Sequence, residues 1–179
     1  MTRTAKTYGG ALYELALDEQ LSGELLRQLD MVCAILAENP DYLRLLSTPS
    51  IAKDERRRLL DEAWSAQLHP YVLNFMKLLC DNGTLRELSG CAREYRRRYN
   101  ADNGIVEVCA ITAVELTPEL RGQLQKKLEA VTGKQIELQT RVDPAVIGGV
   151  RLELSGRQLD GTVASHLEQV QQLLRNTAV

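Results

Sequence analysis

The stretch NGIVEVCAIT, residues 103–112, decides the fold, because the hydrophobic pattern of the chain changes there. The Asn-Gly pair is typical of a turn, and the alternating apolar residues after it predict a strand. Residues 1–104 contain 19 Leu and 4 Val or Ile, whereas residues 105–179 contain 11 Leu and 14 Val or Ile. Since Leu favours helices and β-branched residues favour strands, we expect a helical domain at 1–104 and a strand-containing domain at 105–179.

The first domain contains six stretches in which apolar residues recur every three or four positions, the spacing of one helix face. They predict helices at 4–19, 21–38, 40–46, 52–66, 70–82 and 84–100. The fold class is therefore mainly α, with an N-terminal bundle of about six helices. Gly9 and Gly10 each cost about 1 kcal/mol relative to Ala inside a helix. We expect them to let a second helix approach closely.

The second domain is expected to be a small α+β unit. A helix capped by Thr117 and ended by Gly133 follows the first strand, and two further strands lie near 136–142 and 150–154. A last helix begins after Thr162, and a short strand at 157–160 stays open. The order is β-α-β-β-(β)-α.

The charge favours protein partners over nucleic acid. The chain has 179 residues with 22 basic and 24 acidic side chains, and each domain is close to neutral. A general nucleic-acid binder is usually basic. No run of 18 apolar residues predicts a membrane span, and the N-terminus lacks the apolar core of a signal peptide. We therefore expect a complete, intracellular protein that meets a membrane only indirectly.

No pattern of catalytic or metal-binding residues emerges. The candidates are Cys33, Cys80, Cys91, Cys109, His69 and His166. The cysteines form no C-x-x-C pair, so reduced, partly buried thiols are favoured over a catalytic or metal role. His69 precedes a proline at an expected helix start, which favours a capping role. We expect no catalytic residue, no metal and no cofactor, and an unknown enzyme is a distant alternative.

Two arginine runs, at 56–58 and 96–98, are the basis of an alternative function, a nucleic-acid-binding helical module. Three consecutive residues point in different directions around a helix, so neither run can form one patch. Acidic residues at four-residue spacing also neutralise several of these arginines. Solvated helix faces are the favoured interpretation, and nucleic acid is not expected as a partner.

Two helix faces are candidates for binding a protein. Tyr8, Ala11, Leu12 and Leu15 lie on one face of the first helix and could line a groove for a partner helix, or simply pack into the core. The last helix has a polar face of His166, Gln169 and Gln172, which could lie at an interface or in water. The residues alone leave both alternatives open.

Four motifs resemble the delta subunit of F-type ATP synthase, the family of the mitochondrial oligomycin-sensitivity-conferring protein. They are TYGGALYELA at 7–16, FMKLLCDNG at 75–83, VDPAVIGGV at 142–150, and LDGTV at 159–163 with Leu167. The family patterns are Y-A-x-A-L-[YF]-x-x-A, F-x-x-L-L-x-x-N-(G/R), V-D-P-x-[LI]-[IL]-G-G-[VIF] and [IL]-D-[GA]-S-[VI]-x-x-[RK]-L. The matches cover essentially the whole chain in the family's order. His166 departs from the pattern, because a basic residue usually stands there.

The resemblance implies a non-catalytic stator subunit of a proton- or sodium-driven ATP synthase. Such a subunit links the alpha/beta catalytic head to the b-subunit peripheral stalk and resists rotational torque. One copy per complex is expected, at the cytoplasmic face of the bacterial inner membrane. The alpha-subunit N-terminal helix is expected in a groove between the first and fifth helices. The implied contacts are Tyr8, Ala11, Leu12, Leu15, Phe75, Met76 and Leu79. Stalk-binding residues are unknown, with His166, Gln169 and Gln172 as candidates.

Overall fold

The computed structural model describes residues 2–146, 149–154 and 157–160. The chain divides into two compact units, Met1–Asn100 and Ala101–Val179, which are described separately below. The last expected helix, from 162 onward, lies outside the described residues. None of the helices in the described ranges is long and apolar enough to cross a membrane.

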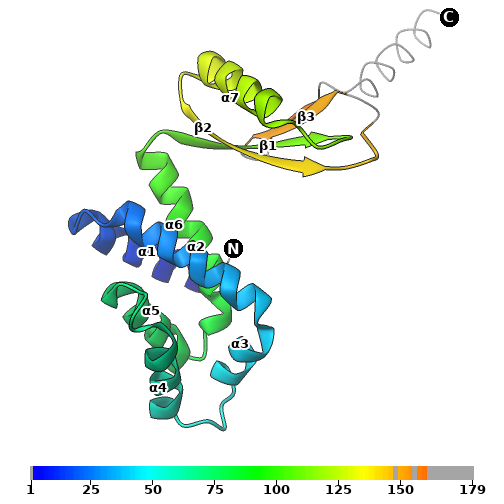
Figure 1. The fold of residues 1–179 in the computed structure, drawn as a ribbon. Helices are drawn as coiled ribbons and strands as arrows, with labels where there is room; N and C mark the ends of the chain where they lie inside the picture. Colours follow the sequence, from blue (N-terminus) through cyan, green and yellow to red (C-terminus); the bar gives the residue numbers. More distant parts are fainter. Residues whose placement is uncertain (1, 147–148, 155–156, 161–179) are drawn as a thin grey trace, which may run out of the picture. The chain divides into compact units, whose positions relative to one another are not determined.

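The first unit is a bundle of α-helices (Figure 1). Its elements are α1 (Arg3–Asp18), α2 (Ser22–Glu38), α3 (Pro40–Leu46), α4 (Lys53–Trp64), α5 (Pro70–Asp81), the short 3-10 helix η1 (Leu85–Glu87) and α6 (Leu88–Asp102). The predicted bundle of about six helices is confirmed.

The ends of α5 show how local sequence sets these boundaries. Pro70 occupies the first turn, where its missing N–H costs nothing, and His69 Nδ1 accepts a hydrogen bond from Tyr71 N–H at 3.3 Å. His69 is thus a capping residue, as expected. After α5, Gly83 has φ +67°, a left-handed conformation that glycine adopts at no steric cost.

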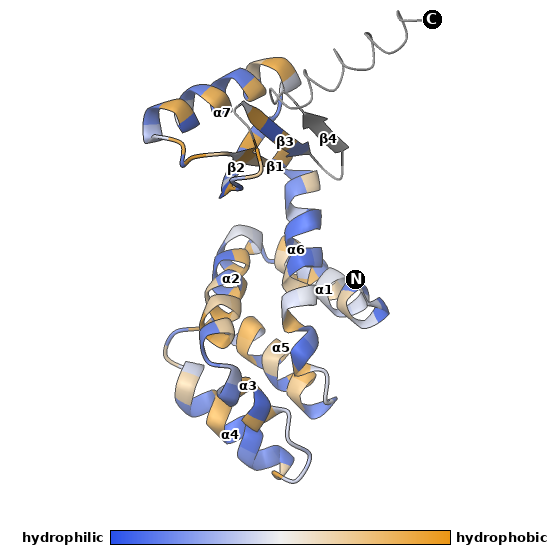
Figure 2. Ribbon diagram, turned by 90° about the vertical axis from the view of Figure 1, so that its right-hand side faces the viewer, coloured by the Kyte–Doolittle hydropathy of each residue, from blue (hydrophilic) through white to orange (hydrophobic). Residues whose placement is uncertain are grey.

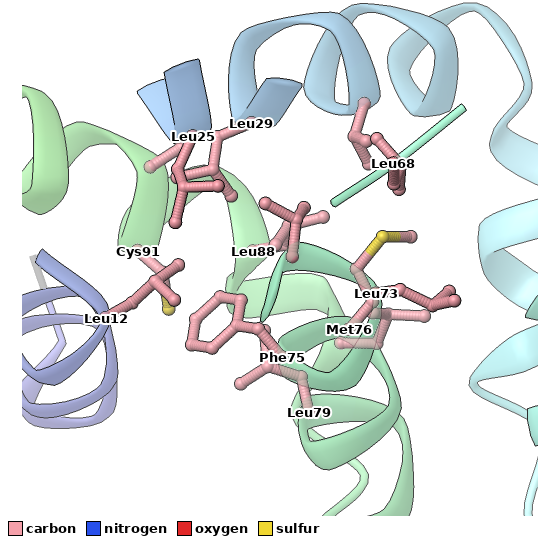
Figure 3. Packing of buried hydrophobic residues seen from close by; sticks show 14 of the residues in the cluster. Leu12, Leu25, Leu29, Leu68, Leu73, Phe75, Met76, Leu79, Leu88 and Cys91 are labelled. Atoms are coloured by element: carbon pink, nitrogen blue, oxygen red, sulfur yellow. The ribbon is translucent and has the colours of Figure 1, made fainter. Parts of the chain in front are cut away.

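One continuous apolar core holds the bundle together. Figure 3 shows Leu12 of α1, Leu25 of α2 and Phe75 of α5 within this core, and their exposed fractions are 5%, 0% and 7%. Full burial of such a side chain contributes about 1.5–3 kcal/mol. Leu residues dominate the core, which is why so few β-branched and aromatic residues suffice.

The close approach expected at the paired glycines occurs at Gly9. A Cβ atom there would collide with the backbone carbonyl oxygen of Cys91, so α1 contacts the backbone of α6 directly. At Gly10 a Cβ atom would lie 2.5 Å from the Arg98 guanidinium, a flexible group that could move. The strict requirement for glycine is therefore at position 9.

The second unit is a small α+β fold, as predicted. Its elements are β1 (Ile105–Thr112), α7 (Pro118–Thr132), β2 (Gln135–Val142), β3 (Val150–Leu154) and β4 (Arg157–Asp160). The sheet order is β2-β1-β3-β4, in which β1 and β2 are parallel and the other pairs antiparallel. The short strand that the sequence left open at 157–160 is present.

α7 covers one face of this sheet (Figure 1). Val108, Ile136 and Leu138 are buried beneath it, and Leu124 and Leu128 of α7 pack against them. Hydrophobic and hydrophilic residues alternate along the helix (Figure 2). Thr117 caps α7 and Gly133 ends it at φ +65°, as the sequence indicates.

Candidate partner-binding groove

A groove of about 390 Å³ runs between α1 and α5, the two helices that the resemblance implies. Two sets of four residues line it: Tyr8, Ala11, Leu12 and Leu15 from α1, and Tyr71, Asn74, Phe75 and Leu78 from α5. In each set the members stand at positions i, i+3, i+4 and i+7, so each helix contributes one face.

The floor of the groove is built from core residues and its rims from exposed leucines. Leu12 and Phe75 are 5% and 7% exposed, whereas Leu15 and Leu78 are 40% and 45% exposed. The two exposed leucines, one from each helix, form an apolar surface in contact with water. Burying this surface against an apolar partner would be favourable.

The structure places five of the seven expected contact residues at the groove and the other two in the core of the bundle. Met76 and Leu79 are 0% exposed and do not line the groove. Asn74 and Leu78 take their places on the exposed face of α5. The sequence missed them because α5 carries apolar residues on more than one face, and periodicity alone does not show which face is buried.

A hydrogen bond joins Tyr8, which lines the groove, to the residue that follows α5. The Asn82 amide nitrogen donates to the hydroxyl of Tyr8 at 3.3 Å, which ties the end of α5 to α1. Both residues belong to the motifs quoted above. They are 74 positions apart in the sequence, so local patterns do not predict their hydrogen bond.

A buried carboxylate of α6, Glu94, binds two arginines of the same helix, one of which also reaches α1. The Glu94 carboxylate is 2% exposed and accepts hydrogen bonds from Arg97 at 2.7 Å and Arg98 at 3.0 Å. These bonds, chiefly that from Arg97, lower the pKa of Glu94 to about 2. Arg98 also donates to Glu14 of α1 at 2.8 Å. Of these ion pairs, only Arg98–Glu14 joins α6 to α1, and because the Glu14 side chain is 71% exposed, this pair adds little to the packing of α1.

The first residue of the first arginine run lies inside the bundle. Arg56 is 6% exposed and donates to the carbonyl oxygens of Leu46 and Cys80, both at 3.2 Å. This corrects the interpretation of the whole run as a solvated face. Arg57 forms a two-pronged ion pair with Asp81, whose pKa it lowers.

The other arginines also have acidic partners within the chain. Arg58 pairs with Glu62 at 3.0 Å, as its four-residue spacing predicts. Arg96 pairs with Asp30 on α2 at 2.5 Å. Since all six arginines of the two runs bind groups of this chain, nothing in their geometry favours a nucleic-acid surface.

The described cysteines are free thiols. Burial raises the pKa of Cys33 and of Cys91 to about 11, so both are protonated at neutral pH and are poor nucleophiles or metal ligands in that form. The candidate stalk contacts His166, Gln169 and Gln172 lie outside the described residues.

Comparisons with known proteins agree on one family. The family model described as ATP synthase delta (OSCP) subunit matches residues 4–174. ATP synthase subunit delta of Alkaliphilus oremlandii is 30% identical over 175 residues, which cover 98% of this chain and 97% of the relative. The Moorella thermoacetica subunit delta is 32% identical over 164 residues, 92% of each chain.

A solved structure has the same fold. A chain of the Toxoplasma gondii mitochondrial ATP synthase hexamer superposes with a TM-score of 0.75, at 16% identity over 97% of this chain and 98% of that one.

Proposed function

The chain belongs to the ATP synthase delta (OSCP) subunit family, and we propose that it is a non-catalytic stator subunit that links the alpha/beta head to the b-subunit stalk. It would serve a proton- or sodium-driven F-type synthase at the cytoplasmic face of a bacterial inner membrane, in one copy per complex. Its contact with the membrane would be indirect, through that complex.

The groove between α1 and α5 is the observation that supports attachment to the head. Its exposed leucines, Leu15 and Leu78, line an apolar hollow between two helices. An amphipathic helix buries residues spaced three and four apart in such a groove. We propose that the alpha-subunit N-terminal helix is that ligand.

The proposed contact set follows from exposure in the structure. It comprises Tyr8, Ala11, Leu12, Leu15, Tyr71, Asn74, Phe75 and Leu78. Covering the exposed part of Leu15 or Leu78 would contribute about 1 kcal/mol each. Leu12 and Phe75, already buried, would shape the floor rather than supply much new buried area.

The two parts of the chain would divide the work. We propose that the bundle, residues 1–104, binds the head, and that residues 105–179 bind the stalk. Torque resistance needs stable attachments at both ends and no chemistry. The floor of the groove is already packed into the core at Leu12 and Phe75. A preorganised groove lowers the ordering cost of binding.

A calorimetric titration of the full chain with an alpha-subunit N-terminal peptide tests the groove. We expect micromolar or tighter binding, and at least tenfold weaker binding for Leu15→Glu, because a carboxylate would be buried against apolar side chains. Leu17→Glu is a matched control, since Leu17 is 49% exposed on the same helix but does not line the groove. Equal affinity of the two variants, or no binding to the folded native chain, would reject the assignment.

A further inference from the structure

The outer edge of β2 is covered along only part of its length. Asp143, the residue after β2, donates its backbone N–H to Thr112 O of β1 at 2.9 Å. The odd-numbered residues of β2 therefore direct their backbone N–H and C=O groups to β1. Backbone direction alternates along a strand. Ile136, Leu138 and Thr140 therefore direct theirs away from the sheet.

Three side chains of α7 cover the first part of that edge. Arg121, Gln125 and Glu129 lie four positions apart on one helix face. Gln125 donates to Ile136 O at 2.9 Å, and Arg121 donates to Leu138 O at 2.8 Å. Glu129 accepts from Ile136 N–H at 3.4 Å. These side chains bind the groups that a neighbouring strand would otherwise bind.

The cover ends where α7 begins, at Pro118. Within the described ranges no hydrogen bond reaches the outward backbone groups of Thr140 or Val142, and Val142 is 48% exposed. A hollow of about 620 Å³ adjoins this open part of the edge. Its lining residues are Glu115, Leu116, Thr117, Pro118, Arg121, Gly122, Gln125 and Thr140.

We propose that an extended segment of the b-subunit stalk pairs with the open part of the β2 edge, residues 140–142, and occupies this hollow. The inference rests on the proposed attachment of the C-terminal unit to the stalk. Outward N–H and C=O groups that recur every second residue, about 6.6 Å apart, match the backbone of another strand. A helix does not fit them, because its own backbone groups are already bonded to one another.

The lining indicates the chemistry of the segment. Leu116 and Pro118 supply apolar surface, while Glu115 and Arg121 contribute opposite charges. The hollow therefore has no net charge, and it fits an uncharged segment with apolar or β-branched side chains facing α7.

Two variants of the full chain and the soluble part of the b subunit form the test. Thr140→Pro removes the outward N–H and puts a ring where the partner backbone would lie, and proline is tolerated at an edge position whose N–H faces solvent. Thr140→Val keeps the N–H and is the matched control. We expect at least tenfold weaker binding for Thr140→Pro and native affinity for Thr140→Val.

Amide hydrogen exchange of the native chain makes the test independent of any variant. On binding the b subunit, exchange at Thr140 and Val142 should slow at least tenfold. If the b subunit binds without slowing these amides, or binds Thr140→Pro as tightly as the native chain, the strand pairing is wrong and the stalk attachment stands. If the b subunit does not bind the native chain, both fail. A native dimer that Thr140→Pro dissociates would assign the edge to a second copy and overturn the proposal.

Discussion

Replacing Glu94 by Gln tests the ion pairs that this buried carboxylate makes with two arginines of α6. The carboxylate is 2% exposed, and hydrogen bonds from Arg97 and then Arg98 lower its pKa from 4.5 to about 2. A shift of that size corresponds to about 3 kcal/mol of stability. Because the folded-state pKa is the lower one, this contribution is complete above about pH 4.5 and is lost as the pH falls towards 2.

Urea unfolding at pH 7, 4.5 and 3 measures the effect. We expect Glu94→Gln to lower the free energy of unfolding by about 3 kcal/mol at pH 7, since the amide gives up charge-assisted hydrogen bonds to two arginines. The difference in the free energy of unfolding between the variant and the native sequence should shrink steadily between pH 4.5 and 3. In this range Glu94 of the native sequence is ionised when folded but takes up a proton on unfolding.

Glu62→Gln is the matched control. Glu62 also pairs with an arginine, but its side chain is 60% exposed, so its loss should cost less than about 1 kcal/mol at any pH. The reasoning would be refuted if Glu94→Gln were equally costly at pH 7 and pH 3, or if both variants cost the same.

Three further predictions concern packing and burial. Gly9→Ala should destabilise the chain by about 2 kcal/mol in urea unfolding, because the new Cβ would meet the Cys91 backbone. Gly122→Ala is the matched control, in an open position on α7, and it should stabilise the chain by about 0.5–1 kcal/mol. Arg56→Met should lower the free energy of unfolding by about 2–4 kcal/mol, since two buried carbonyl oxygens lose their charged donor. Iodoacetamide at pH 8 should label Cys33 and Cys91 of the folded chain far more slowly than the same cysteines of the chain unfolded in urea. Both thiols have a pKa of about 11 in the folded chain, so only about one in a thousand is ionised at this pH.

The local parts of the fold could be predicted from the sequence. Leu at three- and four-residue spacing indicated the bundle helices, and alternating β-branched residues indicated β1 and β2. Caps such as Thr117 and turn residues such as Gly133 act on the nearest few residues, so their effect is visible in a short window.

The rest depends on contacts between distant segments. Arg56 can be buried because carbonyl oxygens 10 and 24 residues away accept hydrogen bonds from its guanidinium, and no local spacing indicates this. Leu78 and Leu79 are adjacent in sequence, yet one is 45% exposed and the other 0%. Only the packing of α5 decides which of them can meet a partner, and this is why the groove residues on α5 were only partly predicted.

Capture of the assembled complex tests the connector role most directly. A tagged copy of this chain, purified from mildly solubilised native membranes, should bring down the alpha, beta and b subunits, with one copy of the chain for each complex. The Leu15→Glu variant should lose alpha and beta but keep b, because only the groove is damaged. Loss of all three subunits with a folded variant, or capture of none by the native chain, would contradict the account.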